Sequence, residues 1–261
     1  MNDIYTSPKT TETFNTLLGG RWHTGFRASV AGQIELERHL AKLAGMNSES
    51  LVLDWGCGPG LVSCDYSLLT GATVVGLSDI PSHIQSGREL ATKLRVPVTF
   101  VLGEARSVTL PFPDGTFDIV VFTESPCHVP IENRKHLFSE FHRVLKPGGH
   151  IVGSDWTCIG GPHCQSHKEL DQAYGTQIGT PVEYRSYLRD TADIRVFTPD
   201  WHSPMTDTII ALYYKVVHGL PISSPFPKAA HTYDDRLLQA GRRLEHTACF
   251  RIVTIHVRTV I

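Results

Sequence analysis

Short apolar runs alternate with helix-type segments along the middle of the chain. The strand-type runs cover 51–54, 72–77, 98–102, 117–122 and 150–155. Helices are predicted over 60–69, 81–94 and 132–145, the last of them stopped by Pro147 and Gly148. Because strands buried on both faces read as nearly continuous apolar runs, this order predicts a parallel sheet covered by helices on both sides.

The flanking segments are less regular. Residues 1–27 are polar and rich in turn residues, and predict an arm or lid. Residues 28–44 carry apolar positions at helical spacing and are closed by Gly45. Further helices are predicted over 166–177, 181–191, 205–217 and 233–246, and strands over 193–197 and 250–260. We therefore predict one α/β domain with an inserted helical cap.

The first strand ends in a glycine turn, LVLDWGCGPG, in which Asp54 precedes Gly56, Gly58 and Gly60. Ligands of parallel sheets bind at the carboxyl ends of the strands, and glycines let a ligand touch the main chain. A dinucleotide fingerprint would need glycine at position 61, which is leucine, and no Gly-Lys-Ser/Thr of a P-loop follows. The carboxylate of Asp54 disfavours a phosphate here and suits an ammonium or sulfonium group.

Composition and charge exclude several classes of partner. The chain of 261 residues has 24 basic and 26 acidic residues, so it predicts no binding to nucleic acid or to an anionic membrane. The N-terminus has no secretory pattern, and no apolar stretch approaches the roughly 20 residues of a membrane helix. The six cysteines lack framework spacing, which predicts free thiols and a cytoplasmic location.

Four motifs in order resemble the class I S-adenosylmethionine-dependent methyltransferases. They are VLDWGCGPG from residue 52, VVGLSDI from 74, GEARSVTLPFPDGTFDIV from 103 and LKPGGHIV from 145. The segment TESPCHVP is similar to the small-molecule branch with sugar O-methyltransferases, tocopherol methyltransferases and glycine-betaine enzymes. It departs from that branch at Pro130-Ile131, where Pro-Asp is frequent.

The resemblance implies a particular fold and organisation. The expected fold is α/β, a doubly wound Rossmann-like sheet of seven strands, mostly parallel with an antiparallel last strand. The expected single domain has an N-terminal arm and helix at 1–45 and a cofactor-binding core at 46–156. A substrate cap with the sixth strand follows at 157–246, and the last strand at 247–261.

The resemblance also assigns residues to the cofactor S-adenosylmethionine. At the glycine turn these are Asp54, Gly56, Cys57, Gly58 and Gly60. Either Ser78 or Asp79 holds the ribose, and both assignments stay open. Glu104, with Ala105, is expected at the adenine, and Thr123 at the end of the fourth strand. In RWHTGF, Trp22 and His23 are expected to cover the methyl donor; the alternative is that they pack an N-terminal helix.

His128 is the first candidate for a general base, and Asp155 in GSDW matches the acid that accompanies it in sugar O-methyltransferases. A histidine with a pKa near 6.5 suits proton removal at neutral pH. The alternative is a loop histidine that only shapes the pocket. Cys158, His163, Cys164 and His167 have a spacing that a zinc site could use. Their Gly/Pro-rich segment favours a substrate loop instead, so no metal is predicted.

The predicted function is methyl transfer to a small molecule in specialised metabolism, on oxygen first, with nitrogen or carbon as alternatives. A second hypothesis is a cyclase or pericyclase of the same fold that binds the cofactor without transferring its methyl group, because fold does not fix function. A third is a non-catalytic subunit. The substrate and the oligomeric state do not follow from the sequence.

Overall fold

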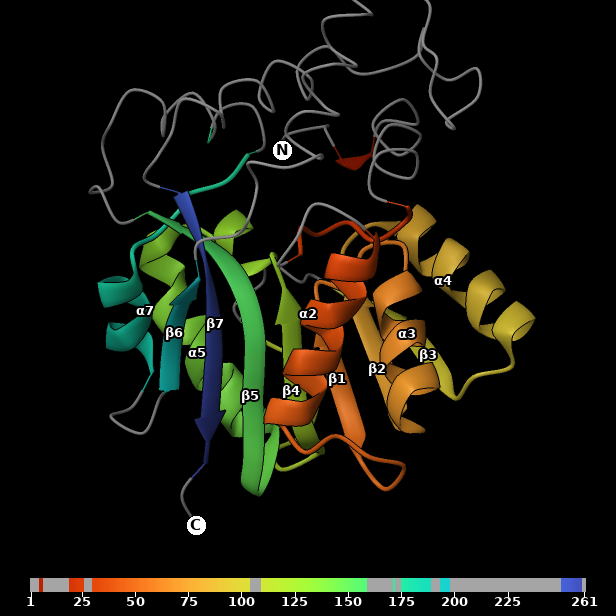
Figure 1. The fold of residues 1–261 in the computed structure, drawn as a ribbon. Coiled ribbons are helices and arrows are strands. Elements are labelled where there is room, and N and C mark those ends of the chain that lie inside the picture. The colour runs from red at the N-terminus through yellow and green to blue at the C-terminus, as the bar shows by residue number, and fades with distance from the viewer. Residues whose placement is uncertain are drawn as a thin grey trace, which may run out of the picture.

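The computed structural model of the chain describes residues 5–6, 19–25, 30–103, 109–158, 171, 175–188, 193–197 and 250–259 (Figure 1). Its centre is a seven-stranded sheet with the order β3-β2-β1-β4-β5-β7-β6. The strands are β1 (Leu51–Trp55), β2 (Thr73–Ser78), β3 (Val98–Leu102), β4 (Phe117–Thr123), β5 (Leu145–Cys158), β6 (Asp193–Phe197) and β7 (Phe250–Arg258). Strands β1 to β5 pair in parallel, and β7 runs antiparallel to both β5 and β6. The predicted fold class is confirmed.

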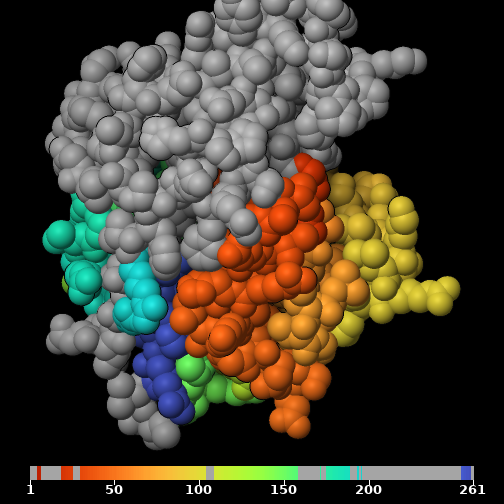
Figure 2. All heavy atoms as spheres, in the orientation of Figure 1, coloured from red at the N-terminus to blue at the C-terminus, as the bar shows by residue number. Residues whose placement is uncertain are grey.

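Helices cover both faces of this sheet. The described helices are α2 (Val30–Leu43), α3 (Leu61–Thr70), α4 (Pro81–Leu94), α5 (Ile131–Val144) and α7 (Pro181–Tyr187). Apolar side chains of α2, α3 and α4 share one core with Val52 of β1, whereas α5 and α7 share the other with Leu53 and Trp55. Helices α2 and α3 are in contact and lie in front of the central strands in Figure 1, and Figure 2 shows their atoms side by side on the surface. Strand β1 is therefore buried on both faces, as its apolar run predicted.

The helix predicted over 132–145 is observed, shifted by one residue, but Pro147 and Gly148 are not what ends it. Helix α5 ends at Val144, and β5 begins at once with Leu145, before Pro147 and Gly148. Phe117 pairs with Leu145 and Ile119 with His150, so β5 carries a bulge that contains the proline and the glycine. A bulge tolerates proline because the ladder needs no N–H there. Strand β5 is thus longer than the predicted 150–155.

The second half of the chain is described only in part. The predicted strand at 193–197 is confirmed, and the helix predicted over 181–191 is observed as Pro181–Tyr187, opened by a capping box of Thr180 and Glu183. The helices predicted over 205–217 and 233–246 lie outside the described residues, as do most of the predicted cap and most of 166–177. None of the helices in the described ranges is long and apolar enough to cross a bilayer.

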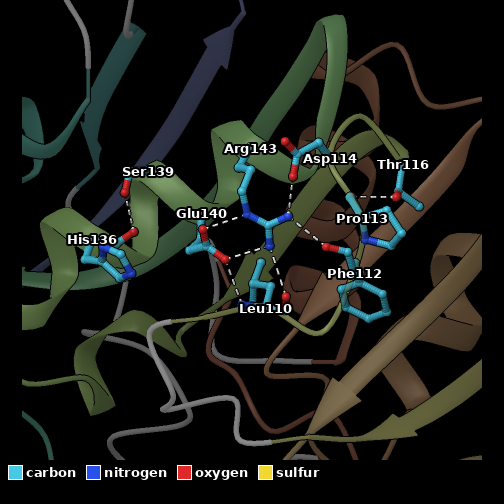
Figure 3. A network of polar contacts seen from close by, with 9 residues as sticks. All are labelled: Leu110, Phe112, Pro113, Asp114, Thr116, His136, Ser139, Glu140 and Arg143. Atoms are coloured by element: carbon cyan, nitrogen blue, oxygen red, sulfur yellow. Dashed lines mark hydrogen bonds and ion pairs between the residues drawn. The ribbon is translucent and has the colours of Figure 1, made fainter.

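Arg143 at the end of α5 holds the turn that leads into β4 (Figure 3). Its guanidinium donates to both carboxylate oxygens of Glu140 and to one of Asp114, each at 2.7 Å. It also donates to the carbonyl oxygens of Phe112 and Leu110, at 2.8 and 3.0 Å. Glu140 in turn accepts from the backbone N–H of Leu110 at 2.8 Å. One side chain therefore satisfies most of the polar groups of this turn.

Arg143→Ala is expected to lower the free energy of unfolding by about 2–3 kcal/mol, because hydrogen bonds to charged groups are lost and Glu140 stays largely buried. The hydrogen bond from Arg143 lowers the pKa of Glu140 below 4.5, so this contribution is complete above about pH 4.5 and is lost at lower pH. Urea denaturation at pH 7 and pH 3.5 measures both effects. Lys146→Ala, which breaks an exposed ion pair with Asp118, is the control, and should cost less than about 1 kcal/mol.

Candidate functional site

The glycine turn between β1 and α3 contains two glycines required by packing and one that faces open space. Gly56, Gly58 and Gly60 all have positive φ, of 76°, 51° and 93°. A Cβ on Gly56 would lie 2.5 Å from the Cβ of Ser125, and one on Gly60 would lie 2.7 Å from the Cα of Gly87. A Cβ on Gly58 would meet nothing within 4 Å. Gly58 therefore presents bare backbone to a space that a ligand can fill.

That space is an open pocket at the carboxyl end of β1. It is lined by Gly20, Trp22, His23, Asp54, Gly56, Cys57, Gly58, Pro59, Leu61, Val62 and Thr123. Seven residues predicted from the sequence thus meet in one place: Trp22, His23, Asp54, Gly56, Cys57, Gly58 and Thr123. Gly60 lies buried behind the turn. Glu104 and Ala105 fall outside the described residues.

Asp54 is the acidic group of the pocket. It is buried and accepts a hydrogen bond from the Oγ of Ser63 at 2.5 Å. Burial raises the pKa of Asp54 to about 6, against the opposing effects of Ser63 and His23. At neutral pH the group is therefore mostly a carboxylate, held where a cationic ligand can compensate its burial. Burial raises the pKa of Cys57 well above its usual value, so this cysteine is a neutral packing residue and not a nucleophile.

The two candidates for the ribose have different surroundings at the end of β2. Ser78 is buried, and its Oγ accepts from the backbone N–H of Ile80 at 3.3 Å. Asp79 follows the strand and is only half-buried. The hydroxyl of Ser78 thus supports the turn into α4, whereas the carboxylate of Asp79 lies nearer to solvent. These positions favour Asp79 for a ribose contact.

Residues 19–25, the end of the N-terminal arm, are held to the domain by ion pairs with α2 and α3. Arg21 forms ion pairs with Glu37 of α2 at 3.2 Å and with Asp65 of α3 at 2.7 Å. The Nε2 of His23 lies 3.0 Å from the same Glu37 oxygen. Burial opposes protonation of His23, but the hydrogen bond to Glu37 and the charge of Glu124 outweigh it and raise its pKa. His23 therefore packs the arm against α2 and also lines the pocket, so both roles considered for it from the sequence are compatible with its position.

Glu124 was not among the residues assigned from the sequence. It follows β4 with a φ of 51°, which is uncommon for a residue other than glycine and is typical of functional sites. Its carboxylate accepts from the backbone N–H of Thr24 at 2.9 Å, from the Thr24 hydroxyl, and from the indole N–H of Trp156 at 2.6 Å. Burial raises the pKa of Glu124. Glu124 therefore connects Thr24 of the arm to Trp156 of β5 through hydrogen bonds.

The candidate base His128 ends a short helix, η2 (Pro126–His128), beyond β4. Its Nε2 lies 3.1 Å from the hydroxyl of Tyr5, and the two rings meet edge to face with centroids 4.9 Å apart. The Tyr5 ring also lies 6.1 Å from that of Trp22, which in turn packs at 4.8 Å on His83. Tyr5 therefore joins His128 to the lining of the pocket, and no sequence signal pointed to it.

Asp155 lies in a buried cluster below η2. It is fully buried, accepts hydrogen bonds from the hydroxyl of Tyr184 and from the N–H of Trp156, and lies near the cation of Arg134. Neither of these two hydrogen bonds reaches His128. The catalytic role predicted for Asp155 stays a prediction, and its contacts favour charge compensation of Arg134.

Arg134 of α5 holds the loop that carries His128. It is fully buried and donates to the carbonyl oxygens of Val129 at 3.0 Å, of Cys127 at 3.3 Å, and of Gln177. The carbonyls on both sides of His128 are thus fixed by one guanidinium. Among the described residues, no group of three or more His, Cys, Asp or Glu side chains is placed to hold a metal ion.

The fold and the glycine turn define an α/β domain of the class I methyltransferase type. Residues 53–153 match the family model described as a methyltransferase domain. A sterol 24-C-methyltransferase from Eremothecium gossypii is 38% identical over 166 residues, 62% of this chain and 43% of that protein. A 27-O-demethylrifamycin SV methyltransferase from Amycolatopsis mediterranei is 27% identical over 205 residues, 71% of this chain and 74% of the relative.

Among solved structures, the cyclase SpnF superposes with a TM-score of 0.74 at 17% identity, over 97% of this chain and 93% of that one. This likeness shows the fold alone. The chain spans less than half the length of the sterol methyltransferase that it matches. Residues 53–153 match a methyltransferase domain, and the resemblance predicted from the motifs is confirmed over that part of the chain.

Proposed function

We propose that this protein transfers a methyl group from S-adenosylmethionine to a small-molecule acceptor, with oxygen as the acceptor atom. The observation that carries the proposal is the pocket at the end of β1, which is lined by the bare backbone of Gly58, by Asp54 and by Trp22. Bare backbone, a buried acid and an aromatic cover suit a ligand with a cationic amino-acid end.

The residues present fit this cofactor. In this proposal Gly58 admits its amino-acid part and Asp54 compensates its ammonium group. Asp79, half-buried after β2, is assigned to the ribose hydroxyls from the motif. Glu104 is proposed for the adenine, on the strength of the motif alone. When bound, S-adenosylmethionine supplies an electrophilic methyl group on a sulfonium with a neutral leaving group. Trp22 and His23 line the pocket, and His23 is held by Glu37. In this proposal both residues shield the methyl donor from water.

His128 is proposed as the general base for the acceptor. Arg134 fixes the loop on both sides of it, and Tyr5 and Trp22 connect it to the pocket. Alignment of donor and acceptor supplies most of the rate acceleration, about 7–11 kcal/mol in well-oriented systems. A base adds about 100- to 10,000-fold for an acceptor that must lose a proton.

The relatives support a small-molecule acceptor, since their names give a sterol and a demethylrifamycin. The near balance of acidic and basic residues supports the same class of partner. We propose that the whole chain is one methyltransferase domain with a substrate cap after residue 156. The described free thiols, Cys57, Cys64 and Cys127, support the predicted cytoplasmic location.

The similarity of the fold to SpnF keeps cyclisation as a second candidate. The two candidates differ in one measurable product. Incubation with methyl-labelled S-adenosylmethionine and small-molecule extracts should move label into an acceptor. Turnover supported equally by S-adenosylhomocysteine, which has no methyl group to give, would instead identify a cyclase.

Gly58→Val is expected to lower the affinity for S-adenosylhomocysteine by about tenfold or more, because its methyl groups fill the open space of the pocket. Calorimetry on the wild type should give one site per chain. Gly45→Val is the matched control, since Gly45 has a similar φ of 63° and nothing within 4 Å, but lies outside the pocket lining. Unchanged affinity in Gly58→Val would contradict the placement of the cofactor.

A further inference from the structure

Tyr5 occupies the position between the candidate base and the cofactor pocket. On one side its hydroxyl lies 3.1 Å from the Nε2 of His128. On the other side its ring lies 6.1 Å from the ring of Trp22, and Trp22 lines the pocket. Any acceptor that gives its proton to this nitrogen while facing the methyl donor must enter the volume that Tyr5 fills.

The hydrogen bond between Tyr5 and His128 involves the same nitrogen that the acceptor would need. Unprotonated Nε2 of a neutral imidazole has one lone pair, and a phenol hydroxyl is a natural donor to it. The acceptor hydroxyl needs the same lone pair, because His128 must take its proton. Tyr5 and the acceptor therefore compete for one atom of His128.

The shape of the volume is that of a flat ring. The Tyr5 ring meets the imidazole edge to face at 81°, and it is tilted by 34° to the indole of Trp22. Both distances fall within the range in which aromatic pairs attract each other. The surroundings of Tyr5 thus recognise an aromatic ring and its hydroxyl together.

We infer that the acceptor is an aromatic hydroxyl, a phenol-type group that displaces Tyr5 from His128. This inference rests on the proposed function and names its substrate class. In the reaction, the phenol O–H bond breaks and its proton goes to Nε2 of His128. The phenol oxygen forms a bond to the methyl carbon, and the carbon–sulfur bond breaks, so the electron pair leaves on sulfur as a neutral thioether.

The experiment removes the tyrosine and adds back its side chain as a free molecule. Tyr5→Ala should bind 4-methylphenol, measured by calorimetry without any methyl donor, about tenfold or more tightly than the wild type. Tyr5→Ala/His128→Ala should bind it about 2- to 10-fold less tightly than Tyr5→Ala, because the hydrogen bond is lost. Tyr187→Ala is the matched control: Tyr187 is also half-buried, but it packs on Phe138 of α5, and its removal should create no such binding.

With labelled S-adenosylmethionine, Tyr5→Ala should convert 4-methylphenol into labelled 4-methylanisole faster than the wild type does. Absence of binding, or binding without labelled product, would overturn the inference. Equal binding and methylation of 4-methylcyclohexanol would overturn its aromatic part. Calorimetry with S-adenosylhomocysteine on the same samples separates the proposed cofactor site from the proposed substrate class. If S-adenosylhomocysteine binds and 4-methylphenol does not, the substrate class is wrong and the cofactor site stands.

Discussion

His128→Ala is expected to lower the rate of methyl transfer by about 100-fold or more, while the affinity for the cofactor stays near that of the wild type. The physical reason is that His128 faces Tyr5 at the acceptor side and is not part of the pocket lining at the glycine turn. Single-turnover rates with labelled S-adenosylmethionine measure the first quantity, and calorimetry with S-adenosylhomocysteine the second.

The pH dependence of the rate tests the same assignment independently. Only neutral imidazole accepts a proton, so the wild-type rate should be low at acidic pH, rise as the pH is raised, and then level off. His136→Ala is the control, because His136 is an exposed histidine of α5, and it should leave both rate and profile unchanged. A rate that does not depend on pH, with a methylated product, would mean that positioning alone drives the reaction.

The sequence predicted those parts of the site that depend on local pattern. The glycine turn follows β1 because an apolar run, an acid and glycines at alternate positions leave the chain few other conformations there. The helix over 81–94 and the strand over 98–102 were predicted to the residue. The prediction that Pro147 ends the preceding helix was wrong. Pro147 lies in a bulge of β5 that is set by pairing with β4, and a bulge accepts a proline that a regular strand would not.

Contacts between distant segments were not predictable in the same way. Tyr5 and His128 are 123 positions apart, and nothing in a polar arm shows where it will settle. The left-handed backbone of Glu124 arises because Thr24 and Trp156 hold its carboxylate from two other elements. Asp155 could be recognised at the end of a strand. The electrostatic effect of Arg134 on it could not, because that effect depends on how α5 packs.

The largest stability effect is expected from the fully buried Arg134. Arg134→Met should lower the free energy of unfolding by about 3–5 kcal/mol at pH 7, because it removes three hydrogen bonds to backbone carbonyls and the positive charge that opposes the effect of burial on Asp155. Burial already raises the pKa of Asp155, and loss of Arg134 raises it further. A carboxyl group with a raised pKa favours the folded state when protonated, so the loss should shrink as the pH falls. Urea denaturation at pH 7 and pH 5 measures this.

Arg134→Met/Asp155→Asn is the decisive companion variant, because it removes the charge together with its partner. It should recover part of the lost free energy of unfolding, because replacing two buried opposite charges destabilises a protein less than removing only one of them. Equal losses in the single and the double variant would mean that Arg134 acts only through its hydrogen bonds to Val129, Cys127 and Gln177. Those bonds flank His128, so the folded double variant should still turn over more slowly than the wild type while binding S-adenosylhomocysteine normally. A normal rate there would show that the loop keeps His128 in place without Arg134, and that the charge pair serves stability alone.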